Sequence, residues 1–256
     1  MTDRITVMGM VLSVMPVGEY DRRLVILTKE RGKISAFAKG ARRQNSPFLA
    51  CSQPFVSGTF TLFEGRTSYT LSSVEVGNFF PELRGSVEFT FYGLYFCEVA
   101  DYLTSEGNDE REILKLLYQS LRALSHAKIG VRLTRLIFEW KMFYLNGEGP
   151  QVTSCVHCRK EGAEGVFRVR AGGLVCAACA EKPERRAAND PDYRLSEGAW
   201  YALRFIASTP PERLFTFTLT DEVQRELCEL AAAYRGEYLR HAFHSLELLE
   251  NVPVGT

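Results

Sequence analysis

The chain has 256 residues, of which 46% are hydrophobic and 24% charged, and 31 lysines and arginines balance 31 acids. This composition is typical of a soluble globular protein with two compact domains and excludes a disordered nucleic-acid tail. Residues 5–17 are apolar enough to resemble a signal peptide, but Gly9, Ser13 and Pro16 interrupt them and no small-residue cleavage motif follows. No stretch reaches the roughly eighteen apolar residues that a membrane helix needs. We therefore expect a cytoplasmic protein, without a membrane segment, whose thiols stay reduced.

The first eighty residues carry the two-residue period of β-strands. Five strands are predicted between turns rich in Gly, Glu and Lys, over residues 5–15, 23–28, 33–38, 56–62 and 68–76. Glu30-Arg31-Gly32 has the composition of a hairpin turn between the second and third strands. The sequence therefore predicts a five-stranded OB-like β-barrel over residues 1–80, a fold that presents one face to single-stranded nucleic acid.

Between Arg22 and Arg43 the chain carries eight cations and one acid, Glu30, although its net charge is zero. The cations are Arg22, Arg23, Lys29, Arg31, Lys33, Lys39, Arg42 and Arg43. Because the second and third strands are adjacent, four of them are expected near one surface, namely Arg22, Arg23, Lys33 and Lys39. In the segment from Lys39 to Ser46, Gly40 lets the backbone approach a phosphate, and amide and hydroxyl donors follow. The run is either a polyanion-binding surface or the solvated face of a hairpin.

Aromatic residues are interleaved with the basic run and the strands that follow it, namely Phe37, Phe48, Phe55, Phe60, Phe63 and Tyr69. An exposed ring can stack on a base, which contributes roughly 1–3 kcal/mol per base. In a small barrel, aromatic residues at alternate positions more often fill the interior. We therefore expect most of these rings in the core.

After Pro81 the apolar residues recur with the period of helices. Three helices are predicted, with apolar faces over residues 89–103, 113–124 and 133–143, and the glycines at 147 and 149 with Pro150 end the third. Two more are predicted at residues 196–207 and 221–249. The fold class is thus α+β and multidomain, with a helical domain at residues 81–256 that a separate module interrupts at about residues 151–190.

Two C-x2-C pairs lie in that module, Cys155 with Cys158 and Cys176 with Cys179, seventeen residues apart. This spacing is typical of a four-thiolate zinc site, and a strand at residues 166–170 with two glycines after it can fold back to join the pairs. A redox dithiol is the alternative, but two pairs occur together outside a strand-to-helix setting. His157 could replace one cysteine, although we expect it at the surface. Four thiolates leave no position for water, so we expect a structural Zn²⁺ ion.

The other chemistry-bearing residues favour structural roles. Cys51, Cys97 and Cys228 are expected as small core residues. His241 and His244, three apart on the last predicted helix, could bind a metal but are expected as a surface pair. No nucleotide-binding loop, metalloprotease helix or nucleophile elbow occurs in the chain. We therefore expect no enzymatic activity.

A basic five-stranded barrel that ends in Lys39-Gly40-x-Arg42-Arg43-x-x-Ser46, followed by helices and the two cysteine pairs, resembles the RecO recombination mediators of bacteria over nearly the whole chain. One departure is Leu145-Asn146-Gly147-Glu148-Gly149-Pro150, where that family commonly has Leu-Gly-hydrophobic-x-Pro. The resemblance implies a nucleoid-associated protein of the cytoplasm that binds single- and double-stranded DNA and anneals complementary strands. It also implies that, with RecR, the protein helps load RecA on DNA coated by single-strand binding protein.

The resemblance implies DNA contacts on the barrel, which we expect at Arg22, Arg23, Lys33, Lys39, Gly40, Arg42, Arg43 and Ser46. It further implies that the helical domain binds the acidic, aromatic-ended C-terminal tail of single-strand binding protein, which needs an apolar pocket with a cation at its rim. The candidates for this cation are Arg132, Arg135 and Lys141, although Arg135 could instead pair with Glu139.

A zinc-stabilised adaptor without direct DNA binding is the alternative function, with the barrel's charge serving an acidic protein partner. Exposed aromatic rings on the barrel beside the cations would favour DNA binding. A contiguous apolar patch on the helices would favour the adaptor.

Overall fold

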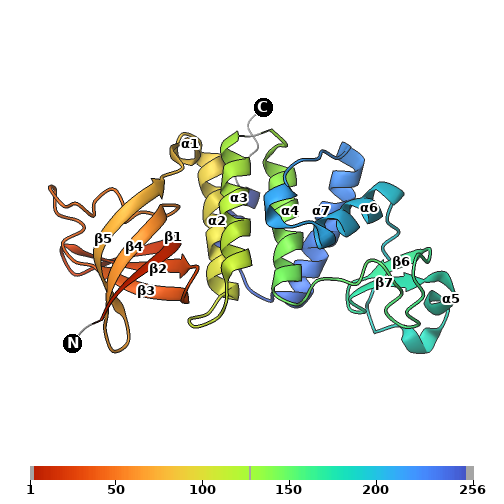
Figure 1. The fold of residues 1–256 in the computed structure, drawn as a ribbon. Coiled ribbons are helices and arrows are strands. Elements are labelled where there is room, and N and C mark those ends of the chain that lie inside the picture. Colours follow the sequence, from red (N-terminus) through yellow and green to blue (C-terminus); the bar gives the residue numbers. More distant parts are fainter. Residues whose placement is uncertain (1–2, 127, 252–256) are drawn as a thin grey trace. The chain divides into compact units, whose positions relative to one another are not determined.

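The computed structural model describes residues 3–126 and 128–251 (Figure 1). The chain divides into two compact units. Unit 1 contains Met1–Lys128 together with Ala242–Thr256, and unit 2 contains Ile129–His241. Within the described residues, no helix combines the length and the apolar character that crossing a membrane requires.

Unit 1 begins with a closed barrel of five strands in the order β1-β2-β3-β5-β4. The strands are β1 (Arg4–Val17), β2 (Asp21–Thr28), β3 (Gly32–Ala38), β4 (Ser57–Glu64) and β5 (Tyr69–Asn78). Neighbouring strands are antiparallel except β3 and β5, which pair in parallel. Apolar residues at alternate positions, such as Leu24, Ile26 and Ile34, fill the interior. The predicted five-stranded barrel is confirmed.

The barrel closes because β1 pairs with two partners. Its first part, residues 4–10, pairs with β4, and residues 9–17 pair with β2. Gly9 lies where both ladders meet, and a Cβ atom there would lie 2.5 Å from the Leu27 carbonyl oxygen. A bulge between Val11 and Ser13 shifts the register of β1 against β2.

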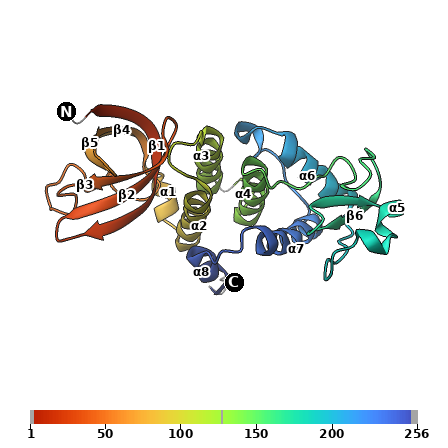
Figure 2. The ribbon, with the colours of Figure 1, turned by 90° about the horizontal axis from the view of Figure 1, so that it is seen from below.

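Four helices belong to unit 1, namely α1 (Pro81–Arg84), α2 (Val87–Leu103), α3 (Arg111–His126) and α8 (His244–Asn251). The Ser86 side chain caps α2 by accepting from the Phe89 N–H. The last helix, α8, packs beside α2 (Figure 2), and the Glu98 carboxylate accepts hydrogen bonds from the N–H and the hydroxyl of Ser245 at 3.1 and 3.0 Å. The C-terminal helix is therefore held in the same unit as the barrel.

Unit 2 is built on α4 (Val131–Leu145), α6 (Glu197–Ser208) and α7 (Asp221–Tyr238). Between α4 and α6 lie β6 (Gly165–Arg168), β7 (Gly173–Cys176) and α5 (Ala177–Ala180). An aromatic cluster joins these parts, because Phe167 of β6 lies 6.3 Å from Trp140 of α4 and 6.0 Å from Tyr234 of α7, measured between ring centroids. The cysteine-containing segment thus packs on the helices through its hairpin.

The predicted helix at residues 221–249 is wrong as a single element. It is interrupted after Tyr238, where Leu239 ends α7 and Arg240 takes a left-handed φ of 38°. The chain then enters unit 1 and forms α8. Consequently His241 and His244 do not share a helix face, although both are exposed, as predicted.

Candidate metal centre and nucleic-acid interface

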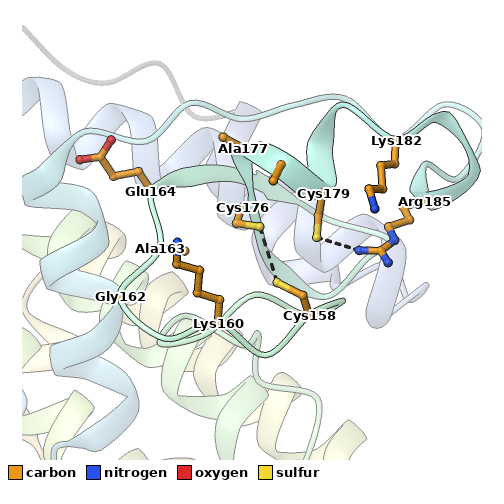
Figure 3. A pocket seen from close by; sticks show the side chains of 11 residues that line it. Cys158, Lys160, Gly162, Ala163, Glu164, Cys176, Ala177, Cys179, Lys182 and Arg185 are labelled. Atoms are coloured by element: carbon orange, nitrogen blue, oxygen red, sulfur yellow. Dashed lines mark hydrogen bonds between the residues drawn. The ribbon is translucent and has the colours of Figure 1, made fainter.

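The four cysteines of the two C-x2-C pairs come together in unit 2. The first pair lies in a turn between α4 and β6, and the second begins at Cys176, where β7 ends and α5 starts. Their four sulfur atoms all lie within 4.8 Å of one another, and the sulfurs of Cys158 and Cys176 are 3.7 Å apart (Figure 3). The antiparallel β6–β7 hairpin produces this closeness, as the sequence predicted.

These residues fit a tetrahedral zinc ion. A Zn–S bond of about 2.3 Å places neighbouring sulfurs about 3.8 Å apart, which matches the separation of Cys158 and Cys176. Cys155, Cys176 and Cys179 are buried, whereas Cys158 is exposed. When bound, the ion would bridge two turns that are otherwise joined by two strands of four residues each.

The surroundings of Cys155 favour its thiolate, whereas burial and hydrogen bonds with the other three cysteines raise the pKa of the Cys179 thiol. Burial acts to raise the pKa of the Cys155 thiol, but hydrogen bonds from the backbone N–H groups of Cys176 and Cys158 outweigh it and lower this pKa to about 6. The Arg185 guanidinium donates to the Cys179 sulfur at 2.8 Å. Lys160 and Lys182 line the same hollow of about 640 Å³ (Figure 3). These cations offset the negative charge that four thiolates retain around a divalent ion.

Two other side chains near the cysteines are not placed for zinc chemistry. His157 is exposed and is not part of the four-residue cluster, which agrees with the surface position predicted for it. The Glu164 side chain lines the hollow but points away from the sulfur atoms in Figure 3. Because four sulfurs complete a tetrahedron, the donor set is that of a structural site.

Residues 151–193 are called the cysteine module. A buried arginine supports its second half. Arg168 is 0% exposed, and its guanidinium donates to Asp192 Oδ1 at 2.7 Å and to the Ala180 carbonyl at 3.0 Å. The hydrogen bond from Arg168 lowers the pKa of the Asp192 carboxyl. Gly173 allows the hairpin to approach Gln151, since a Cβ atom there would lie 2.2 Å from the Gln151 carbonyl oxygen.

On the barrel, residues 39–43 form a loop with exposed cations, which we call the cation loop. Lys39, Arg42 and Arg43 are exposed, whereas Ala41 is 0% exposed and anchors the loop in the barrel core. Gly40 takes a left-handed φ of 67°, and its N–H donates to the Asp21 carboxylate at 2.7 Å. The loop is thus fixed beside the turn that connects β1 and β2.

Two of the residues predicted to contact DNA have partners within unit 1. Arg22 lies on the same side of β2 as the core residue Leu24, and its guanidinium donates to the Leu49 and Ser52 carbonyls at 3.1 and 2.9 Å. Lys33 pairs with Leu27, at the other end of the hairpin. There the Lys33 ammonium forms a 2.8 Å salt bridge with Asp101 of α2. Both side chains therefore hold unit 1 together and do not join the cation loop.

The remaining predicted contacts lie around the loop. Arg23 is exposed and its Nε donates to the Ser35 hydroxyl at 2.8 Å, while Arg23 and Phe37 are cross-strand partners. Ser46 is half-buried, and its hydroxyl accepts from the Phe48 N–H at 3.2 Å. Arg23 thus remains available beside the cation loop, whereas the Ser46 hydroxyl already serves its own turn.

Most predicted rings are not exposed, as expected. Phe55, Phe60 and Tyr69 are buried, Phe37 and Phe48 are half-buried, and Phe63 is 39% exposed. Tyr20 was not among the predicted residues and is 43% exposed in the β1–β2 turn. The Arg43 guanidinium carbon lies 5.0 Å from the centroid of the Tyr20 ring. The position of Tyr20 in the turn just before the basic run was the signal that could have identified this residue.

The three cations predicted for tail binding differ in their surroundings. Arg132 is exposed. Arg135 donates to Glu139 Oε1 at 2.9 Å, the same oxygen to which Arg235 donates at 3.0 Å, so the predicted alternative of an Arg135–Glu139 pair is confirmed. Lys141 is 6% exposed and donates to the Ile206 and Ala207 carbonyls at 3.1 and 3.0 Å. Lys141 therefore satisfies carbonyls at the end of α6.

The prediction that Cys228 lies in the core is wrong. Cys228 is exposed on α7, whereas Cys51 and Cys97 are buried as predicted.

Comparison with known proteins covers nearly the whole chain. The family model for the recombination protein O N terminal matches residues 1–80, and that for its C terminal matches residues 84–247. The DNA repair protein RecO of Acetivibrio thermocellus is 29% identical over 245 residues, which are 95% of each chain. That of Shouchella clausii is 34% identical over 232 residues, covering 90% of this chain and 88% of its own. With both family models matched in order, the chain belongs to the RecO family of DNA repair and recombination proteins.

Proposed function

We propose that this protein is a recombination mediator that binds single- and double-stranded DNA at the cation loop and anneals complementary strands. With RecR, it helps load RecA on DNA coated by single-strand binding protein. We place this activity in the cytoplasm, at the nucleoid. The observation that carries the proposal is the cluster of Lys39, Arg42 and Arg43, all exposed on a loop whose backbone is fixed by Gly40 and Ala41.

The proposed mechanism is electrostatic. Two DNA strands repel each other, and cations that neutralise the phosphates of both lower this repulsion. Contacts to phosphates carry no sequence information, so the bases stay free to pair with each other. No bond is made or broken. The protein's own contribution is a rigid arrangement of charge, because the Arg42 N–H donates to the Tyr20 carbonyl at 2.8 Å and ties the cation loop to the β1–β2 turn.

The adaptor alternative is less well supported. It would be favoured by a barrel whose aromatic residues are all buried beneath its charges. Tyr20 instead lies exposed beside Arg43, and Phe63 is also exposed on the barrel. Rings next to cations are the combination that single-stranded nucleic acid recognises.

A structural zinc ion is part of the proposal. Cys155, Cys158, Cys176 and Cys179 would hold it, and the ion would supply the cross-link that keeps the cysteine module folded. Arg185 would keep the Cys179 thiolate in place through its 2.8 Å hydrogen bond.

The salt dependence of binding tests the DNA proposal. If about four phosphates of a single strand are contacted, affinity is expected to fall about fiftyfold between 50 and 200 mM salt, since each contact contributes roughly 0.7 to the slope. Fluorescence anisotropy of a labelled oligonucleotide measures this slope. Annealing of two complementary labelled strands, followed by energy transfer, measures the second activity. A salt slope near zero, together with annealing no faster than in the absence of the protein, would refute DNA binding and leave the adaptor as the better proposal.

We also propose that the helical part of unit 2 binds the acidic tail of single-strand binding protein with Arg132 as the cation. Arg132→Ala is expected to weaken binding of a tail peptide about tenfold, the effect of losing one charge-assisted hydrogen bond. Titration calorimetry with the peptide measures it, and Arg225→Ala, which removes an exposed arginine of α7, is the matched control. Equal affinities in Arg132→Ala and in the unaltered protein would remove Arg132 from the site.

A further inference from the structure

Tyr20 is a solvent-exposed aromatic residue beside the cation loop. It is 43% exposed, and the turn that carries it is fixed by two hydrogen bonds from Arg42, one from its N–H to the Tyr20 carbonyl at 2.8 Å and one from its guanidinium to the Gly18 carbonyl at 3.3 Å. The Arg43 guanidinium carbon lies 5.0 Å from the Tyr20 ring centroid. The ring is therefore positioned before any ligand arrives, which lowers the entropy lost on binding.

We infer that Tyr20 is a stacking platform for one base of single-stranded nucleic acid, with Arg43 behind it and the cation loop beside it. This inference rests on the proposed DNA binding and adds a contact to a base, which the phosphate contacts alone do not provide. A guanidinium over one side of a tyrosine ring is attracted to its π electrons and holds the ring in one orientation. The exposed remainder of the ring is a flat apolar surface, which every base can cover irrespective of sequence.

The strands next to this turn carry further exposed side chains. Met15, Arg23 and Phe37 form one cross-strand row over β1, β2 and β3. Met15 is 61% exposed and Arg23 is exposed, so the row alternates an apolar side chain, a cation and a half-buried ring on the outside of the barrel. A surface that combines cations with exposed apolar side chains suits a strand whose phosphates and unpaired bases both need partners. A duplex, whose bases are stacked internally, offers only its phosphates.

A comparison of two oligonucleotides of equal length and charge tests the inference. One carries thymine at every position and the other is abasic throughout. Tyr20→Ala is expected to weaken binding to the thymine strand about 5- to 150-fold and to leave binding to the abasic strand within about twofold. The salt slope on the thymine strand is expected to stay unchanged in Tyr20→Ala, whereas Arg43→Ala is expected to lower it by about 0.7. Anisotropy of the labelled strands gives the four affinities of the unaltered protein and of Tyr20→Ala, and the three salt slopes on the thymine strand.

Further variants test whether the effect requires an aromatic ring and whether it requires position 20. Tyr20→Phe keeps the ring and is expected to bind like the unaltered protein, whereas Tyr20→Leu keeps apolar bulk without the ring and is expected to lose affinity. Tyr201→Ala, which removes an exposed tyrosine of α6 in unit 2, is the matched control and is expected to change nothing. Thermal unfolding of each variant checks that it is folded.

Each other result overturns the inference in a distinct way. An equal loss on the thymine and abasic strands would mean that Tyr20 only positions Arg43. No loss on either strand would remove Tyr20 from the binding surface. Failure of the unaltered protein to bind either strand would refute the proposed function itself, and the stacking site with it.

Discussion

Replacing Cys155 with serine is expected to abolish metal binding and to unfold the cysteine module. Cys155 is 0% exposed, and its sulfur lies within 4.8 Å of the other three. Removal of one thiolate opens the tetrahedron and takes away most of a binding free energy that amounts to about 10 kcal/mol or more in zinc-finger peptides. Two strands of four residues cannot form a stable sheet without that contribution.

Metal content and proteolysis measure the effect. Mass spectrometry of the purified protein is expected to find about one zinc ion per chain before the change and none after it. Trypsin is expected to cleave the variant rapidly within residues 159–186, where Lys160, Lys182 and Arg185 surround the cysteines. Cys228→Ser, which alters an exposed cysteine that is not part of the cluster, is the matched control and is expected to keep both its metal and its resistance to trypsin. A Cys155→Ser variant that keeps a full zinc complement would contradict the four-thiolate site.

Replacing Lys39, Arg42 and Arg43 together with alanine is expected to weaken DNA binding about a hundredfold at 0.1 M salt. Each lost phosphate contact lowers the slope by about 0.7, so three contacts lower it by about 2. Because phosphate contacts carry no sequence information, the loss is expected to be the same for all sequences. The barrel is expected to stay folded, since these three side chains are exposed while Ala41 keeps the loop anchored.

The control removes the same charge from another element of unit 1. Arg111, Lys115 and Arg122 are exposed on α3, where Arg111 pairs with Asp109 and Lys115 pairs with Glu112. Exposed pairs of this kind contribute at most about 1 kcal/mol each to stability, so the triple alanine variant is expected to fold. Anisotropy titrations of both triple variants over the same salt series separate a local site from general attraction. Equal losses in the two variants would mean that net charge, and not the cation loop, attracts DNA.

The local features of this protein were predictable from sequence. The five strands and the cores of α2, α3, α4 and α6 follow from alternation and helical period, since each pattern involves residues only a few positions apart. The four-cysteine cluster was predictable for a similar reason, because each C-x2-C turn brings two sulfurs together by itself. Only the hairpin between the pairs had to be added, and its glycines at 172 and 173 indicated it.

Which cations of the basic run bind other parts of unit 1 could not be predicted from sequence. This depends on contacts between residues far apart in the chain. Arg22 and Lys33 belong to the same basic run as Arg23 and Lys39. Arg22 nevertheless binds the carbonyls of residues 49 and 52, and Lys33 binds Asp101. Strand register and the packing of α2 decide this, and both involve residues far apart in the sequence.

Short-range periodicity and fixed spacing were enough to specify the barrel, the helices up to α6 and the four-cysteine cluster. Contacts between residues far apart in the chain set which cations are exposed, bury Lys141 at the end of α6 and pack α8 on α2. They also bring Arg43 to Tyr20. The physical reason is that a side chain's availability depends on what the rest of the chain places around it, and burial and pairing are properties of the whole fold.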